Sequence, residues 1–265
     1  MSAVNDRTIS KANDAIAGNL DTSFLKILAL VFMLVDHLGA SVLTGIPELR
    51  IIGRMAFPLY AWCLVVGSVK TKSPVRYALR LLLMAVVSQP LYMMALNHTW
   101  QDMNILFTLL IALAAIQGIR AKWLGSQFWA PLLCYLLLGY FKVDYGWKGV
   151  TFILVLYLAR ENRMGLCASY LAYSLFWGAS SSNVRSLFGI PLSFLSLPGI
   201  GQPLSAFFKL QGMVWLSLPL IAGNTRVKLR MPKWVGYALY PMHLVLLIMI
   251  KLLTGTSVAA LLRGF

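Results

Sequence analysis

Long hydrophobic runs alternate with short polar stretches along almost the whole chain. A helix needs about 20 apolar residues to cross the hydrocarbon core of a bilayer. The runs lack the alternating pattern of transmembrane β-strands. We therefore predict an all-α, polytopic transmembrane helical bundle of about nine spans, with eight to ten as the range. The predicted spans are 23–43, 51–69, 77–95, 104–119, 127–141, 147–159, 166–178, 207–223 and 234–252.

Two segments depart from this pattern. Residues 1–22 are polar and lack the apolar stretch of a secretory signal peptide, so they are interpreted as an N-terminal tail. Residues 187–206 are hydrophobic but contain three prolines and three glycines. This composition is typical of an interfacial or re-entrant segment, and one more membrane span is the alternative. The remaining loops are short, and residues 23–265 are predicted to form a single transmembrane domain.

Basic residues set the expected orientation, because cytoplasmic loops of membrane proteins are rich in Lys and Arg. One set of connections, including the loop with Lys70, Lys72 and Arg76, holds eleven basic residues. The alternate set holds four, namely Arg50, Lys142, Lys148 and Arg185. We therefore expect a cytoplasmic N-terminus and, with nine spans, a C-terminus on the outer side.

Composition supports the membrane interpretation. Hydrophobic residues make up 59% of the chain and charged residues 12%, about half the charge of a soluble domain. A soluble enzyme and a disordered chain are thereby excluded. The net charge of +15 is explained by the basic loops, and without a compact basic domain or zinc spacing we expect no nucleic-acid binding. The three cysteines show neither metal nor disulfide spacing.

Asp36 and His37 stand inside the first predicted span, where ionisable groups are costly and are functional candidates by default. Adjacent residues of a helix point about 100° apart, so the two side chains address different neighbours. Their partners must come from other helices. A carboxylate and an imidazole suit proton transfer near neutral pH. The alternative is a structural ion pair between helices.

Arg54 and His243 are the other strong candidates within spans. Pro58 removes the backbone donor to the carbonyl of Arg54, which predicts a helix kink, and Gly53 permits close approach of another backbone. Arg54 could neutralise Asp36, hold an oxyanion or phosphate, or simply reach the interface. His243 follows Pro241 within the last span, and a structural role for it is equally open.

The outer connection near 96–104 adds His98, Asp102 and Asn104 to the same side of the membrane. Asn104 could also cap the following helix. An ordinary hydrated loop is the alternative. Asp144, Tyr145 and Gly146 form a comparable but less specific group. The pattern predicts a small polar cluster in an apolar bundle. His37 and His243 alone do not provide enough ligands for a zinc site, so no metal is expected.

Five motifs occur together in this chain: LKILALVFMLVDHLGA, ELRIIGRMAFPLYAW, NILFT, DYGWKGV and LYPMHL. In combination they resemble the TraX family, the F-pilin acetylation proteins of conjugative plasmids and their chromosomal relatives. The resemblance runs from about Phe24 to Leu247, and the first two motifs are the specific ones. The polar tail and the 187–206 segment fall outside what the motifs match.

The resemblance implies an integral, multi-pass acetyltransferase of the bacterial inner membrane, with acetyl-CoA as donor and a pilin subunit or another membrane-proximal group as acceptor. Carried over by motif, its residues are Asp36, His37, Gly53, Arg54, Pro58, Asn104, Gly146 and His243. Physical inference assigns His37 as the base, Arg54 as the oxyanion or phosphate partner, and Asp36 as the residue that holds Arg54 or His243. His98, Asp102, Asn104, Gly53 and His243 are expected to bind substrate or support the site.

The donor is cytosolic, whereas the predicted base lies nearer the outer face. A pantetheine arm reaching into the bundle would solve this, with its phosphates held by Lys70, Lys72 and Arg76, or by Arg226, Lys228 and Arg230. Three other functions stay open. An acyltransferase for a surface sugar or lipid would share the site, a secondary transporter would need no acetyl-CoA, and a pilin assembly partner would tolerate changes at Asp36, His37 and Arg54.

Overall fold

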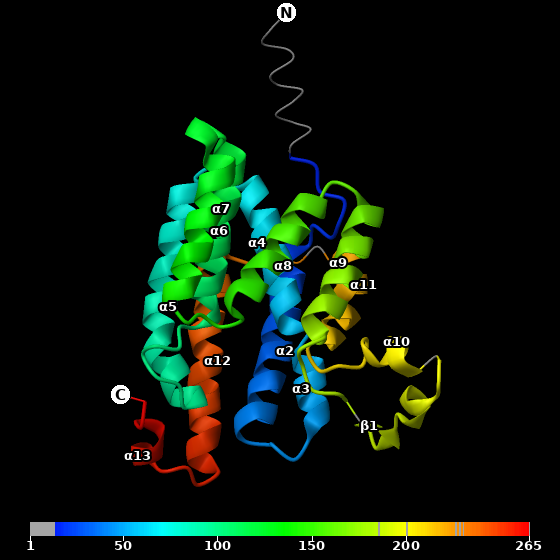
Figure 1. The fold of residues 1–265 in the computed structure, drawn as a ribbon. Coiled ribbons are helices and arrows are strands. Elements are labelled where there is room, and N and C mark those ends of the chain that lie inside the picture. The colour runs from blue at the N-terminus through cyan, green and yellow to red at the C-terminus, as the bar shows by residue number, and fades with distance from the viewer. Residues whose placement is uncertain are drawn as a thin grey trace, which may run out of the picture.

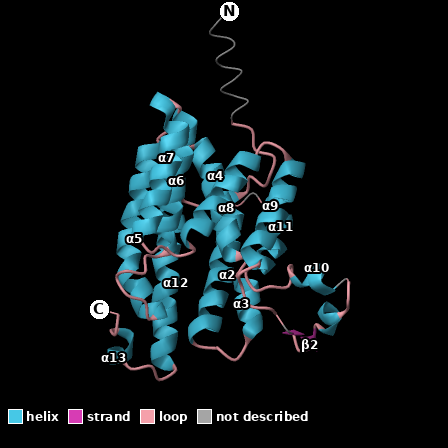
Figure 2. Cartoon of the chain, viewed as in Figure 1, coloured by secondary structure: helices cyan, strands magenta, loops and turns pink. Residues whose placement is uncertain are grey.

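A computed structural model describes residues 14–184, 186–199, 201–225, 227, 229 and 231–264. Helices packed side by side make up most of this part of the chain (Figure 1), and the only strands in it form one short hairpin (Figure 2). Residues 1–13 of the predicted tail lie outside the described residues. So do Arg185 and the second set of candidate phosphate-binding residues, Arg226, Lys228 and Arg230.

The principal helices follow the predicted runs closely. They are α2 (Thr22–Ser41), α3 (Pro47–Gly53), α4 (Ala56–Lys70), α5 (Pro74–Leu96), α6 (Ile105–Ala121), α7 (Ser126–Tyr140), α8 (Gly146–Ala159), α9 (Arg163–Gly178), α11 (Leu218–Ala222) and α12 (Lys233–Leu253). Short 3₁₀ segments η1 (Trp123–Gly125) and η3 (Gly212–Ser217) precede α7 and α11, and α13 (Val258–Leu261) follows α12.

Four helical stretches are long and apolar enough to cross a membrane: Thr22–Ser41, Pro47–Lys70, Pro74–Leu96 and Val235–Leu253. The other five predicted spans coincide with shorter helical segments. The 14 residues of α8, for example, extend about 21 Å, less than the roughly 30 Å of a hydrocarbon core. A helical membrane fold is therefore confirmed, while the number of crossings and the side of the N-terminus stay predictions.

The Pro- and Gly-rich segment 187–206 does not form a further span. It contains strand β2 (Ile190–Pro191), paired with β1 (Ser186–Leu187), then η2 (Ser193–Ser196) and α10 (Gly201–Ser205). These short elements extend from the side of the bundle near α3 (Figure 1). Proline lacks the backbone donor and glycine weakens the helix, which explains why the hydrophobic run stays irregular.

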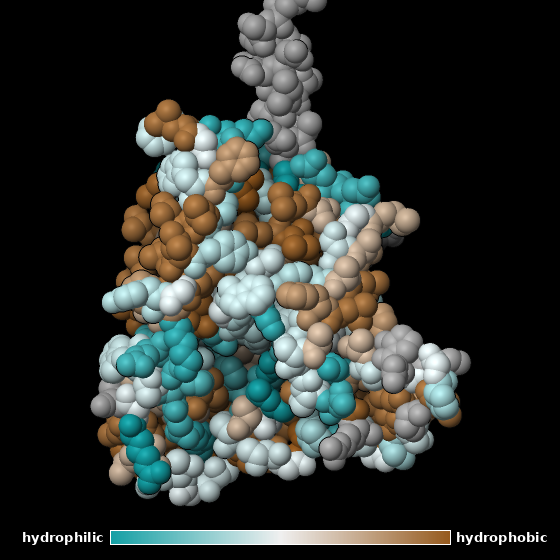
Figure 3. Space-filling model, viewed as in Figure 1, coloured by the Kyte–Doolittle hydropathy of each residue, from teal (hydrophilic) through white to brown (hydrophobic). Residues whose placement is uncertain are grey.

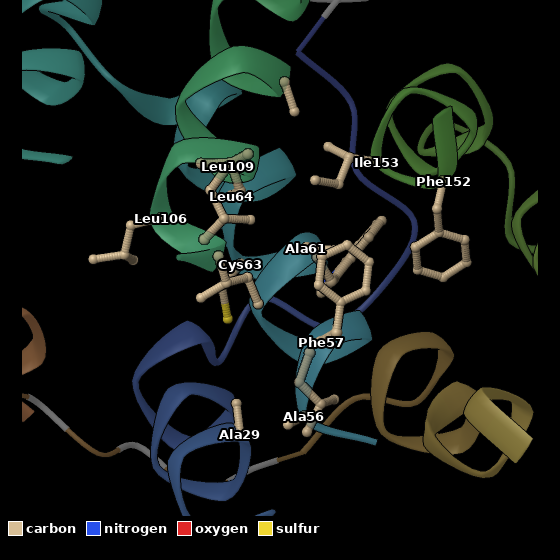
Figure 4. Packing of buried hydrophobic residues seen from close by; sticks show 14 of the residues in the cluster. Ala29, Ala56, Phe57, Ala61, Cys63, Leu64, Leu106, Leu109, Phe152 and Ile153 are labelled. Carbon is tan, nitrogen blue, oxygen red and sulfur yellow. The ribbon is translucent and has the colours of Figure 1, made fainter. Parts of the chain in front are cut away.

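Helix α4 forms the centre of the bundle, and twelve of its fifteen residues are buried. Phe57, Cys63 and Leu64 of α4 belong to one apolar cluster with residues of α6 and α8 (Figure 4). Close packing and dispersion, rather than exclusion from water, stabilise such contacts between helices in lipid. Because α4 begins two residues after Arg54, this packing helps to fix the position of that residue.

Residues 14–21, here called the N-terminal strap, tie together parts of the chain that are distant in sequence. The backbone N–H of Ala17 donates to the carbonyl of Arg160, and that of Asn19 donates to the carbonyl of Ile221. The indole N–H of Trp62, in α4, donates to the carbonyl of Asn19 at 2.8 Å. The strap therefore joins the central helix to the α8–α9 connection and to α11.

Candidate active site

A cavity of about 450 Å³ lies between α2, α3 and α12, and we call it the polar cavity. Its ionisable lining residues, apart from tyrosines, are Asp36, His37, Arg50, Arg54, His98 and Asp144. On the face shown in Figure 3, hydrophilic residues gather around a hollow in the lower half, and brown apolar patches lie above it. The sequence-predicted polar cluster is thus a real cavity in an apolar bundle.

Asp36 is clamped by two arginines of the next helical segment. The Nη2 atom of Arg54 lies 2.5 Å and 2.6 Å from the two carboxylate oxygens, and Nη1 of Arg50 lies 2.7 Å from one of them. Asp36 and Arg54 are both buried, while the Arg50 side chain is 32% exposed. Charge-assisted hydrogen bonds of this kind fix the orientation of both partners. Arg54 also donates to Oε1 of Gln211 at 3.1 Å.

A break between α3 and α4 places Arg54 at the cavity. Helix α3 ends at Gly53, and α4 begins at Ala56 after a two-residue turn. Pro58 has no N–H to donate to the carbonyl of Arg54, so the regular hydrogen-bond ladder stops there. The helix kink predicted at this proline is confirmed. By contrast, α12 continues through Pro241 without interruption.

His37 faces His243 rather than Asp36. Their ring centroids are 5.3 Å apart and the rings are stacked. His243 is buried and also contacts the ring of Tyr240 edge-on at 5.0 Å. The Nδ1 atom of His37 is buried and has no hydrogen-bond partner among the described residues. The predicted separation holds: Asp36 and His37 take their partners from different helices.

The remaining candidates lie on the α5–α6 connection, and they differ in whether they line the polar cavity. His98 lines the cavity and stacks on Tyr92 at 4.8 Å. Asn104 is fully buried, caps α6 as predicted by accepting from Leu106 N–H, and donates to Gln89 Oε1 at 2.9 Å. It is absent from the cavity lining, so its contribution is structural.

Asp102 also lies outside the cavity lining. It forms an ion pair with Lys142, a residue that precedes α8, and its Oδ2 lies 3.7 Å from Nδ1 of His98. The hydrogen bond from Lys142 and the backbone N–H of Thr99 lower the pKa of Asp102 to about 2. Asp102 therefore joins two loops and stays ionised at neutral pH, without touching the space where a substrate would bind.

Several residues of the site were missed or undervalued from sequence. Arg50 was counted only as a loop charge, although its spacing of four residues before Arg54 predicts the same helix face. Gln211 lies in a loop that carries no motif. Tyr92 and Tyr240 are not candidates in the sequence analysis, yet both line the cavity. Tyr145, noted only as part of a less specific group, lines it too.

The three candidate phosphate-binding residues lie in a different place. Lys70, Lys72 and Arg76 line, with Arg80, a depression of about 390 Å³ that we call the basic depression. Lys70 and Arg80 also line a second cleft of about 370 Å³, here the apolar cleft, whose walls include Leu64, Leu81 and Leu109. Ile105 and Tyr240 line both the apolar cleft and the polar cavity. The basic depression and the apolar cleft are therefore neighbours that share wall residues, and so are the apolar cleft and the polar cavity.

The apolar helices and the polar cavity between them define a helical membrane protein with an ionisable site among its helices. The chain belongs to the TraX protein family, whose model matches residues 21–251. It is 32% identical over 169 residues to the probable fimbrial assembly protein FimC, serogroup H1, of Dichelobacter nodosus, covering 58% of this chain and 69% of that protein. It is 28% identical over 214 residues to Protein TraX of Escherichia coli, covering 72% and 85% respectively. No solved structure matches the chain.

Proposed function

We propose that this protein is an acetyltransferase of the inner membrane that moves an acetyl group from acetyl-CoA to the N-terminal amine of a pilin subunit. Membership of the TraX family and the fimbrial relative support a role in pilus maturation. The observation that carries the chemistry is the buried Nδ1 of His37, which has no partner in the described residues and belongs to a side chain lining the polar cavity. An imidazole side chain in the wall of such a cavity is a candidate to move protons.

The reaction requires that an ammonium group lose two protons. An N-terminal amine has a pKa of about 7.7–8.0, so most of it is charged near neutral pH. In our proposal, His37 accepts the first proton and releases it to solvent. The neutral nitrogen then forms a bond to the thioester carbonyl carbon, and the carbon–sulfur bond breaks. The second proton passes from nitrogen to sulfur, giving the acetylated amine and free CoA thiol.

Arg54 and Arg50 supply the positive charge for this step. As nitrogen attacks, negative charge develops on the carbonyl oxygen, and fixed cations near that oxygen lower the barrier. Asp36 holds both arginines at 2.5–2.7 Å and so prevents them from reorienting. In this assignment Asp36 positions the arginines, and His243 positions His37 through their stacked rings.

The neighbouring positions of the three spaces suggest how a cytosolic donor reaches this chemistry. The basic depression suits the phosphates of CoA, because Lys70, Lys72 and Arg76 bring three cations together. The apolar cleft suits the pantetheine arm, and the residues it shares with the polar cavity would bring the thioester toward His37. This arrangement supports acetyl-CoA as donor and needs no acyl-enzyme on Cys63, which lines the cleft rather than the cavity.

The intact mass of the candidate pilin tests the proposal. It would be measured in cells that carry the wild-type chain, His37→Ala, His37→Gln, or no chain. Cys167→Ser on α9 is the matched control, because Cys167 touches neither the cavity nor the cleft. We expect one acetyl group with wild type and Cys167→Ser, and none with the other samples, at equal amounts of chain in the membrane.

Other outcomes separate the remaining functions. Acetylation that persists in both His37 variants would reject His37 as the base while keeping the enzyme. An unmodified pilin with wild type, together with CoA release on addition of a sugar or lipid acceptor, would indicate a different acyl acceptor. Flux of a solute into vesicles without any dependence on acetyl-CoA would indicate a transporter and overturn the proposal.

A further inference from the structure

Asp144 is an acidic side chain of the polar cavity that the reaction described above does not use. It lies between α7 and α8 and lines the cavity with its neighbour Tyr145. Its backbone N–H donates to the carbonyl of Met103 at 2.9 Å, and its own carbonyl accepts from the hydroxyl of Thr108. The backbone is thus held on both sides, so the carboxylate keeps a fixed place in the cavity wall.

The two carboxylates of the cavity differ in their partners. Asp36 is bound by Arg50 and Arg54. Asp144 forms no ion pair with any described residue, although the charges of Arg54 and Arg50 are close enough to favour its ionised form. A half-buried carboxylate without a direct ion-pair partner is costly, and such a group is usually paired or functional. Burial raises the pKa of Asp144 to about 6, so the side chain is still ionised at neutral pH.

The net charge of the cavity also indicates a role for the Asp144 carboxylate. Arg50 and Arg54 contribute two positive charges and Asp36 one negative charge, which leaves an excess of one positive charge. That excess favours the developing oxyanion but repels an incoming ammonium group. The carboxylate of Asp144 cancels it and provides a separate negative point on another part of the wall.

Aromatic rings line the same cavity as the Asp144 carboxylate. Tyr92, Tyr145 and Tyr240 line the cavity together with Asp144. The ring of Tyr145 is stacked on Phe57 with centroids 4.2 Å apart, so it is held in place by the central helix. Faces of aromatic rings attract cations, and a carboxylate beside several rings is a common way to bind an ammonium group.

We infer that Asp144 binds the acceptor of this protein as a cation, with the ammonium group of a primary amine as the chemical class that the site selects. The inference rests on the proposed acetyl transfer and adds the residue that recognises its acceptor. Asp144 contacts the amine before it is deprotonated, and His37 then removes the proton. Neutral hydroxyl acceptors gain nothing from Asp144 and are disfavoured.

Enzyme kinetics with defined probes test this. The purified full chain would be given acetyl-CoA and a peptide amide that copies the first ten residues of the mature candidate pilin. A second peptide carries a hydroxyl in place of the N-terminal amine. A charge-assisted hydrogen bond contributes about 1.5–3 kcal/mol, so Asp144→Asn should raise KM for the amine peptide about tenfold to a hundredfold, with a smaller change in kcat. Asp144→Glu should restore part of the loss, and Asp14→Asn, in an exposed ion pair of the N-terminal strap, should change nothing.

A second measurement avoids the possibility that a variant fails to fold. The same peptide with a trimethylated N-terminus is a permanent cation that cannot be acetylated. It should compete with the amine peptide in the wild-type protein, whereas the hydroxyl peptide should compete poorly. Acetylation of the amine peptide combined with no competition by the cation, or with an unchanged KM in Asp144→Asn, would overturn the inference alone. Absence of acetyl transfer to any acceptor would instead reject the proposed function.

Discussion

Gly53 lies directly against Asp36: a Cβ atom built on Gly53 would stand 2.2 Å from the Cβ of Asp36 and 2.6 Å from its Cα. No real side chain fits at that distance. The absence of a side chain therefore lets α3 approach α2 closely enough for Arg50 and Arg54 to reach one carboxylate. The position needs glycine for space rather than for a special backbone angle.

Gly53→Ala should consequently separate α2 from α3 and weaken both arginine contacts. Overpacking of this kind costs about 1–3 kcal/mol, and acetyl transfer should fall with it because Arg54 moves. Gly139→Ala on α7 is a matched control, since nothing lies within 4 Å of the Cβ it would add. Thermal unfolding in detergent and the pilin mass would be compared. Equal behaviour of the two variants would contradict this account of the site.

Asp36→Asn should destabilise the fold more than removal of a surface charge. Arg54 is 9% exposed and would lose its counterion, which typically costs about 3–5 kcal/mol for a buried pair. The double variant Asp36→Asn/Arg54→Gln should recover part of this stability, because no uncompensated charge stays buried.

Asp14→Asn is the control for this prediction, because Asp14 pairs with Arg120 at 2.8 Å on the surface and exposed pairs contribute at most about 1 kcal/mol. Unfolding temperatures of the four proteins would be compared. A double variant less stable than Asp36→Asn would show that the two residues do not act as a pair.

The basic depression predicts a specific effect on the donor. Single changes of Lys70, Lys72 or Arg76 to Gln should raise KM for acetyl-CoA by about 1.5- to 5-fold each and leave kcat almost unchanged, because exposed charge pairs contribute about 0.2–1 kcal/mol. Higher ionic strength should raise the wild-type KM in the same direction. Lys122→Gln, an exposed basic residue after α6, should have no effect. An unchanged KM in all three variants would place the CoA phosphates elsewhere.

Replacement of Asp144 should raise the stability of the fold but lower the activity. Its pKa in the folded protein, about 6, is above the roughly 3.9 of an unfolded Asp, so protonation favours the folded state. The cost of the ionised carboxylate is present above about pH 6 and disappears as the pH falls toward about 4. Asp144→Asn should therefore raise the unfolding temperature at pH 7 while weakening acceptor use.

The same residue predicts a pH dependence of catalysis. Wild-type kcat/KM for the amine acceptor should decline as the pH falls through about 6, because Asp144 becomes neutral there. In Asp144→Asn this part of the profile should be lost. A profile identical in both proteins would assign the acidic limb to another group.

The local features of the fold were predictable because they follow from residue types. The helix break before Pro58, the cap at Asn104 and the close approach at Gly53 each depend on a missing donor, a side-chain acceptor or a missing Cβ. The irregular 187–206 segment could be recognised as unusual, but its proline and glycine content did not decide between interfacial structure and a span. The short helices left the number of crossings undecided for the same reason, since hydropathy fixes where apolar runs lie but not how deep each one extends.

The site was predictable only in part, because its geometry depends on which helices are neighbours. Asp36, His37, Arg54 and His243 stood out as ionisable residues within apolar runs. The pairing of His37 with His243 joins α2 to α12, more than 200 residues apart in sequence, and no local pattern encodes it. Asp102 and Asp144 looked equivalent as loop aspartates, yet Lys142 pairs with Asp102 and leaves Asp144 to the cavity.

The N-terminal strap has a consequence for the order in which the chain is assembled. Its partners at Arg160 and Ile221 are synthesised long after the strap itself has left the ribosome. Membrane segments are produced from the N-terminus onward, so α2 is made before the partners of the strap exist. The strap can form these bonds only when the later helices have been added. A segment that is made early is therefore among the last to be secured, and a chain that stops before residue 221 leaves the strap without its bond to Ile221.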